Sequence, residues 1–238
     1  MSLQADAPPH KLPGEILRHK LSVRISHWLN SAAFIVLLVS GIGIVLAHPQ
    51  FYWGETGYFG MEPWLKLWFE PDLTHTSWGR NLHFLFAWVF VVNGAIYILT
   101  GLLSGHFQQK ILPTWQQLRP TNVLAELSAR LRLRRHNAQE LENYNLLQKF
   151  TYLVVIFVLC PLMLLSGLTM SPGFVTALPE LTDLFGGRQS GRSIHFICAS
   201  LLALFLVIHL IEVALAGAGK LLRSMITGSL KSHRNDNE

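Results

Sequence analysis

The chain has 238 residues, and its composition excludes most classes of water-soluble protein. Half of the residues are hydrophobic and only 14% are charged, whereas about a quarter of the residues in a typical soluble domain are charged. Lys and Arg outnumber Asp and Glu by 19 to 14, which gives a formal net charge of +5. These cations are spread along an apolar chain, a distribution that suits membrane orientation and anionic lipid and disfavours binding to nucleic acid.

The two cysteines exclude several covalent and metal frameworks. Cys160 and Cys198 each lie inside an apolar run, and the sequence contains neither a CxxC nor a CxxCH motif. A disulfide scaffold, a structural zinc site and covalently attached c-type haem are therefore disfavoured.

Four apolar runs are long enough to cross a bilayer, whose hydrocarbon core of about 30 Å needs about 20 helical residues. They lie at 23–47, 81–103, 148–170 and 193–216. We therefore expect an all-α membrane protein, a four-helix bundle over 23–216 with tails at 1–22 and 217–238. The first run is longer than a signal-peptide core, which predicts an uncleaved span although residues 45–47 resemble a cleavage site.

The distribution of Lys and Arg predicts the orientation of these spans. Fifteen of them lie in the amino-terminal tail up to Arg24, in the 104–149 connection and in the carboxyl-terminal tail, and four lie on the other side. Both termini and the middle connection are thus expected in the cytoplasm. The connections at 48–80 and 171–192 are then extracytoplasmic.

Two connections are candidate surfaces. Residues 121–135 combine an apolar stripe with four arginines, a pattern typical of a helix on an anionic membrane leaflet, and a solvated basic face is the alternative. The 48–80 segment carries six Trp and Tyr residues. Such residues are enriched in the headgroup region, and the same aromatic side chains would also suit a docking surface.

Four of the eleven histidines lie within the predicted spans, namely His27, His83, His195 and His209. Ionisable side chains at such depth are rare and usually functional, and helix packing through a hydrogen bond is the alternative for any one of them. His195 and His209 are 14 residues apart, so both face one side of the helix at depths about 21 Å apart.

The alternating directions of the spans predict how these histidines pair. His27 and His209 lie at the inner level, whereas His83 and His195 lie at the outer level. Two axial imidazoles complete the coordination of a haem iron and leave no position for substrate, which is typical of electron transfer. The pattern predicts haems between the helices, two non-covalent haems b with bis-His ligation, and the separation between levels excludes one four-His zinc site.

Three arginines, Arg24, Arg80 and Arg192, each precede a candidate ligand by three residues. Residues three apart share a helix face, and each arginine lies one turn nearer to water than its histidine. Guanidinium groups at these positions suit the haem propionates. Arginines that only snorkel or set topology are the alternative.

Two glycines fit the same geometry. Gly41 follows His27 by 14 residues and Gly94 follows His83 by 11, so each offers bare backbone on the face where a haem ring would pass. Close helix packing explains the same residues equally simply.

Glu212 lies three residues after His209 and shares its helix face. It is a candidate proton carrier for a quinone, and the alternatives are a snorkelling carboxylate or an ion pair with Lys220. His106, just beyond the second span, is the best substitute ligand at the inner level, and surface roles are expected for the other six histidines.

Three stretches carry a family resemblance: HKLSVRISHWLN at 19–30, AHPQFYWG at 47–54 and GRSIH at 191–195. They resemble the bacterial cytochrome b membrane subunits, a superfamily that includes the gamma subunits of formate dehydrogenase, the b-type cytochromes of nickel-iron hydrogenases and the thiosulfate-reductase-like cytochromes. The resemblance extends over residues 19 to 220. It implies a multi-pass protein of the bacterial inner membrane that carries two haems b and passes electrons between quinone and a catalytic partner.

The resemblance also implies particular residues and partners. The haem ligands map onto the same four histidines, and the quinone site maps near His27, Asn30, His209 and Glu212. The 47–54 stretch is most similar to the branch that accompanies molybdopterin oxidoreductases, so an extracytoplasmic enzyme of that class is the expected partner, with the quinone pool and membrane lipid.

Three alternative functions stay open at this point. Two belong to the same class: a hydrogenase cytochrome b subunit, and a stand-alone quinone-reducing or superoxide-oxidising cytochrome b. The third is a haem-free transporter or anchor that uses its histidines for packing or metal passage. The colour of the purified protein distinguishes the third from the others, because only a haem protein is red.

Overall fold

Four long apolar helices dominate the computed structural model. The structure describes residues 15–17, 20–57, 61–74, 76–105, 112–114, 117, 119–121 and 146–231. The basic helix predicted at 121–135 lies outside the described residues except for Thr121, and His106 also lies outside them. The expected four-helix membrane architecture is confirmed, because all four helices have the length and apolar composition needed to cross a bilayer.

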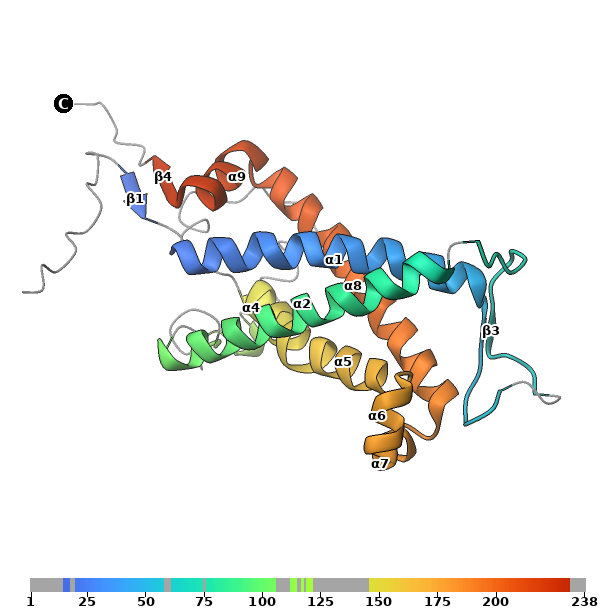
Figure 1. The fold of residues 1–238 in the computed structure, drawn as a ribbon. Coiled ribbons are helices and arrows are strands. Elements are labelled where there is room, and N and C mark those ends of the chain that lie inside the picture. Colours follow the sequence, from blue (N-terminus) through green and yellow to red (C-terminus); the bar gives the residue numbers. More distant parts are fainter. Residues whose placement is uncertain are drawn as a thin grey trace, which may run out of the picture.

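The first two spans form an antiparallel hairpin. Helix α1 (Leu21–Ala47) packs along α2 (Thr76–Leu103), as Figure 1 shows. The connection between them contains the short antiparallel strands β2 (Gln50–Phe51) and β3 (Leu65–Lys66).

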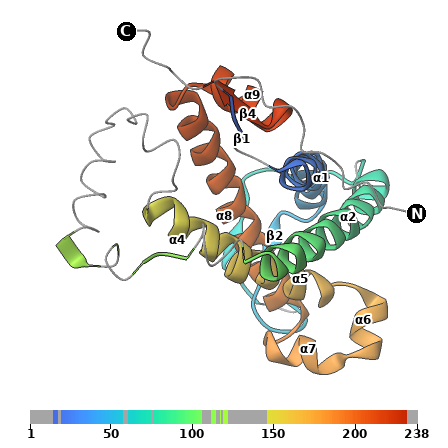
Figure 2. The ribbon, with the colours of Figure 1, turned by 90° about the vertical axis from the view of Figure 1, so that its left-hand side faces the viewer.

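The third and fourth spans form the second hairpin. The third is composite, with α4 (Leu146–Val154), a π-helical turn η3 (Val155–Leu159) and α5 (Cys160–Leu168). Pro161 explains the irregular turn, because its ring lacks an N–H group and clashes with the carbonyl four residues earlier. Short helices α6 (Pro172–Ala177) and α7 (Pro179–Leu184) lead to α8 (Arg188–Leu215). Helix α8 packs against α5 and is tilted across the bundle (Figure 2).

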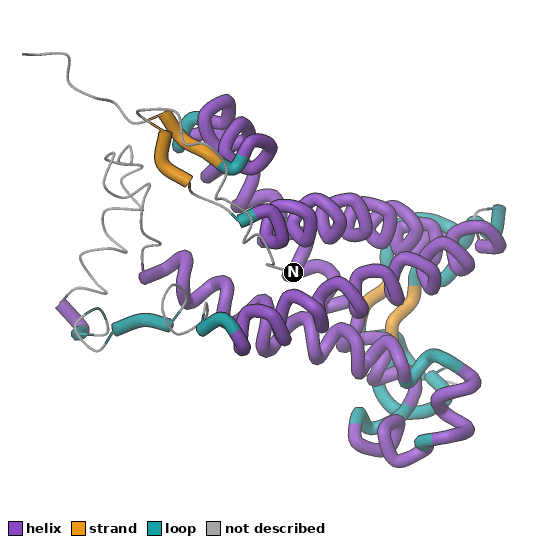
Figure 3. The backbone as a smooth tube through the Cα atoms, turned by 60° about the vertical axis from the view of Figure 1, so that its left-hand side comes forward, coloured by secondary structure: helices purple, strands orange, loops and turns teal. Residues whose placement is uncertain are grey.

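The bundle has two distinct ends. We call the end that carries β2, β3, α6 and α7 the loop end, and the opposite end the terminal end (Figure 1). At the terminal end, α9 (Ala218–Thr227) follows α8, and β1 (Glu15–Leu17) pairs antiparallel with β4 (Ser229–Lys231). Figure 3 shows this strand pair beside α9. The first and last described elements of the chain therefore meet at one end of the bundle.

Helix α9 is attached to the start of α1. Gly217 adopts a left-handed conformation with φ of 96°, which glycine tolerates without steric cost, and this residue separates α9 from α8. The Arg24 Nε and Trp28 Nε1 atoms both donate hydrogen bonds to the Met225 carbonyl, at 3.3 and 3.2 Å. Because carbonyls in the last turn of a helix lack intrahelical donors, these bonds fix the position of α9.

Two helices begin earlier than hydrophobicity predicts. Helix α2 begins at Thr76 and α8 at Arg188, whereas the apolar runs begin at 81 and 193. The first N–H groups of α8 find partners in the outer connection: Arg188 N donates to Glu55 Oε2 at 2.9 Å, and the next two amides donate to the Gly54 carbonyl at 3.0 and 3.2 Å. Such capping lets the helix extend past its apolar segment.

The apolar side chains of the spans face outward. Only 6% to 17% of the most hydrophobic window of each span is buried, and large side chains such as Leu99 and Leu103 are exposed. Water would not solvate so much apolar surface, whereas lipid tails do.

Candidate functional site

His83 and His195 meet at the loop end, although they lie on different hairpins. Their ring centroids are 6.2 Å apart and their planes are inclined by 65°. Two metal–nitrogen bonds of about 2 Å, with half an imidazole ring on each side, span roughly 6 Å. The separation therefore fits two axial ligands of one haem iron.

The proton positions on these two rings follow from their hydrogen bonds. His195 Nδ1 lies 3.0 Å from the Met163 carbonyl and 3.3 Å from Ser166 Oγ. A carbonyl only accepts, so Nδ1 carries the proton and Nε2 keeps its lone pair. His83 Nδ1 lies 3.0 Å from Ser40 Oγ, whose own hydrogen is donated to the Val36 carbonyl. Both rings thus present an unprotonated Nε2, as iron ligation requires.

Two glycines lie directly against these rings. A Cβ atom at Gly41 would lie 3.4 Å from His83 Cε1, and one at Gly167 would lie 3.2 Å from His195 Cε1. Gly41 was expected to leave space for a haem ring, and in the structure its missing side chain leaves space for the His83 imidazole. Gly167 was not found from the sequence. Gly94, the other glycine expected to clear a haem, has no described atom within 4 Å of a built Cβ.

His27 and His209 come together at the terminal end. They lie on α1 and α8 within electrostatic range of each other, and both are half-buried. The Phe205 ring stacks on His209 at 5.9 Å, and Trp28 lies edge-on to His27 at 5.4 Å. His27 Nδ1 is buried and has no hydrogen-bond partner among the residues that the structure describes. A buried nitrogen normally has a partner, and the described residues supply none for this one.

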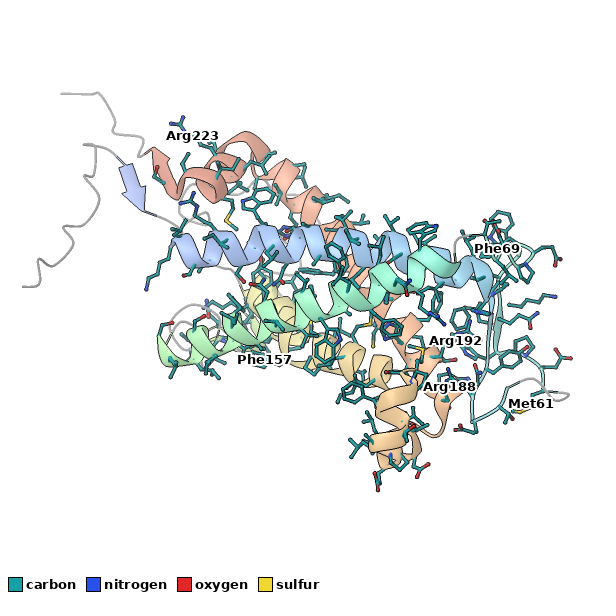
Figure 4. The ribbon with its side chains drawn as sticks, viewed as in Figure 1. Met61, Phe69, Phe157, Arg188, Arg192 and Arg223 are labelled. Atoms are coloured by element: carbon teal, nitrogen blue, oxygen red, sulfur yellow. The ribbon has the colours of Figure 1, made fainter. Side chains whose placement is uncertain are left out.

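The three predicted propionate arginines have different surroundings. Arg192 donates to the carbonyls of His48 and of Gln50, the latter at 3.0 Å, and its guanidinium lies 4.7 Å from the centre of the Phe51 ring. Figure 4 shows it at the loop end of α8. Arg24 is bound to the α9 carbonyl described above. Arg80 is exposed. Because a guanidinium has five donors, Arg24 and Arg192 keep further donors for an anion.

A buried amide pair joins α1 to α2 near the terminal end. Asn93 Nδ2 donates to Asn30 Oδ1 at 2.7 Å and to the Ser26 carbonyl at 3.0 Å. Asn93 is 8% exposed and was not found from the sequence, although a polar amide inside an apolar span was the available signal. Asn30 is therefore held by the neighbouring helix.

A cavity that contains several polar side chains and an apolar groove adjoin each other between the third span and α8. The cavity, of about 120 Å³, is lined by His209 and Glu212 from α8 and by residues of α4 that include Gln148 and Tyr152. Gln148 Nε2 lies 3.5 Å from Glu212 Oε2. The groove, of about 300 Å³, runs along the π-helical turn and shares Phe205 with the cavity, together with one threonine of α4. This arrangement suits a molecule with a polar head and an apolar tail.

Comparison with known proteins identifies the family of this chain. The family model described as prokaryotic cytochrome b561 matches residues 18–228. A relative from Azospira oryzae, named putative protein-methionine-sulfoxide reductase subunit YedZ1, is 32% identical over 200 residues, which cover 83% of this chain and 90% of the relative. The chain therefore belongs to the prokaryotic cytochrome b561 family and, with its four membrane-spanning helices, is a membrane b-type cytochrome that transfers electrons through haem.

Proposed function

We propose that this chain is a dihaem cytochrome b subunit that carries electrons between the quinone pool and an extracytoplasmic redox enzyme. The observation that carries the proposal is the occurrence of two imidazole pairs, each of which joins the two hairpins at a different level of α8. In this proposal His83 and His195 bind one haem and His27 and His209 bind the other. Haem supplies reversible one-electron chemistry at its iron when it is bound.

The chain's own residues would hold and separate the two cofactors. Their histidines on α8 are 14 residues apart, a rise of about 21 Å. Arg80 and Arg192 are proposed to balance the propionates at the loop end, and Arg24 those at the terminal end. Gly41 and Gly94 are proposed to leave room for the haem edges. The Lys and Arg distribution supports a cytoplasmic terminal end and an extracytoplasmic loop end.

The cavity beside His209 is the proposed quinone site. Its polar side chains would bind the headgroup, and the adjoining groove would accept the apolar tail from the bilayer. Quinol oxidation releases two protons with two electrons, and Glu212 is the proposed proton acceptor next to the ligand His209. Asn30, one helical turn after His27, is the residue that α1 is proposed to contribute to the quinone site.

Replacing Glu212 with Gln is expected to slow the reduction of haem by quinol at least tenfold, because positioned acid-base groups contribute about 100-fold or more. Haem content should be unchanged, since Glu212 is not a proposed ligand. Stopped-flow absorbance of the detergent-solubilised chain, mixed with a short-tailed quinol, measures the rate. Glu180→Gln, an exposed carboxylate on α7 at the opposite end, is the matched control. Equal rates in both variants would move the quinone site elsewhere.

The loop end is the proposed docking surface for the enzyme partner. Trp68 is 93% exposed and Met61 is 51% exposed, and Glu62 and Glu70 are exposed beside them. Met61 and Phe69 lie at the outer edge of this end in Figure 4. Exposed aromatic side chains are typical of interfaces, and the relative's name describes the subunit of a reductase. These observations support a redox enzyme partner, which we propose to be a molybdopterin oxidoreductase.

A photo-crosslinker in place of Trp68 is expected to capture an extracytoplasmic redox enzyme in cells, whereas one in place of Leu222 on α9 should not. Mass spectrometry of the purified adducts identifies the captured protein. Capture of a cytoplasmic redox protein at Leu222 alone would reverse the docking side. Rapid superoxide oxidation or quinone reduction by the isolated chain would instead support a stand-alone enzyme, and capture of a hydrogenase would support the hydrogenase subunit.

A further inference from the structure

The two hairpins share a local motif around the loop-end histidines. The second helix of each hairpin carries Gly-Arg-x-x-His, at 79–83 and at 191–195. The first helix of each carries a Ser-Gly pair, at 40–41 and at 166–167. In both hairpins the Ser-Gly pair contacts the histidine of its own hairpin. Two segments far apart in the sequence therefore each place a Ser-Gly pair against a histidine.

The glycines of the motif let the helices approach closely at this level. A Cβ atom at Gly79 would lie 3.4 Å from the Ser40 carbonyl, and one at Gly191 would lie 2.1 Å from Thr169 Oγ1. The close approach buries both serines, which are 1% and 0% exposed at positions 40 and 166. Their hydroxyl groups consequently have no access to solvent, and each lies beside one imidazole Nδ1 atom.

We propose that Ser40 and Ser166 are matched positioning residues that hold the Nδ1–H groups of His83 and His195 and thereby set the donor strength of each Nε2 toward haem iron. Each hydroxyl donates to a carbonyl of its own helix, Val36 for Ser40 and Met163 for Ser166. Its oxygen is thus oriented to accept from the imidazole. A hydrogen bond to the outer nitrogen fixes the tautomer and raises the basicity of the ligand.

The two histidines differ in how much their hydrogen bonding depends on the serine. His195 keeps a 3.0 Å hydrogen bond to the Met163 carbonyl in addition to the 3.3 Å contact with Ser166. His83 Nδ1 lies 3.0 Å from Ser40 Oγ, which is closer than the contact between His195 and Ser166. Loss of the hydroxyl should therefore lower the donor strength of Nε2 more at His83 than at His195.

Ser40→Ala is expected to raise the midpoint potential of the loop-end haem, because a less basic ligand stabilises ferric iron less. Ser166→Ala should raise the same potential by a smaller amount. The terminal-end haem should keep its potential in both variants. Alanine is a good helix former, so both chains should fold and retain haem. A spectroelectrochemical titration of the complete chain in detergent resolves the two potentials.

Ser200→Ala is the matched control, because Ser200 on the same helix as His195 also donates to a carbonyl four residues earlier, at 2.9 Å, but is exposed. Ser40→Thr keeps the hydroxyl and should restore the original potential. The proposal rests on the proposed haem ligation, and the two fail in different ways. Absence of haem from the unaltered chain refutes the ligation itself. An unchanged potential in a haem-replete Ser40→Ala chain overturns the positioning role alone, as does haem loss that Ser40→Thr does not restore.

Discussion

Replacing either His83 or His195 with alanine is expected to remove one and the same haem and leave one haem per chain instead of two. The expectation follows from the 6.2 Å separation of the two rings, since neither imidazole alone completes a six-coordinate iron. His27→Ala and His209→Ala should remove the other haem. Pyridine haemochrome assays measure the haem content, and reduced-minus-oxidised spectra show which component is lost.

The pattern of losses tests the pairing as well as the number of haems. If His83→Ala removed the component that His27→Ala removes, the assignment of ligands to levels would be wrong. A haem content of one per unaltered chain would show that one of the two histidine pairs does not bind haem. A content of zero would favour the alternative function of a haem-free transporter or anchor. His48→Ala is the control at the loop end. Partial burial and the nearby Arg192 lower the pKa of His48, so alanine removes no positive charge at pH 7. The His48 backbone carbonyl that accepts from Arg192 is kept in this variant, so both haems should stay in place.

Gly191→Ala is expected to lower the thermal stability of the protein and to deplete the loop-end haem. The added Cβ would lie 2.1 Å from Thr169 Oγ1 and 3.1 Å from Thr169 Cβ, so α8 must move away from α5 one turn before His195. Overpacking of this kind costs about 1–3 kcal/mol, and ligand geometry tolerates little displacement. Thermal unfolding in detergent and the haem content of the purified variant measure the two effects.

A second substitution separates steric conflict from any other role of Gly191. Thr169→Gly in the Gly191→Ala background removes all the conflicting side-chain atoms and should recover most of the lost haem. Gly219→Ala on α9, where a Cβ would meet no described atom within 4 Å, should be nearly neutral. Equal haem loss in the single and double variants would contradict the steric explanation.

Much of the fold follows from local information in the sequence. Hydrophobicity over about 20 residues identifies the four spans, because each helix satisfies its own backbone hydrogen bonds in the bilayer. The 14-residue interval between His195 and His209 defines two depths, because the helical rise per residue is fixed. Span alternation then assigns His27 and His83 to those depths. These predictions depend on distances along single helices, which the sequence encodes directly.

Tertiary structure decided the features that depend on helix rotation and on contacts between distant segments. Hydrophobicity did not predict the early start of α8, because Glu55 and Gly54 supply partners for its first amides from more than 130 residues away. The contacts of Arg192 with the loop-end carbonyls also depend on that long-range packing.

The immediate surroundings of the ligands were likewise decided by tertiary structure. Ser40, Ser166 and Gly167 occur in apolar spans where serine and glycine are common, so composition alone did not distinguish them. They acquire a role only because α1 packs on α2 and α5 packs on α8 with one particular rotation about each helix axis. Lipid solvates every apolar face almost equally, so the amphipathic pattern that would reveal such a rotation in a soluble bundle is weak here.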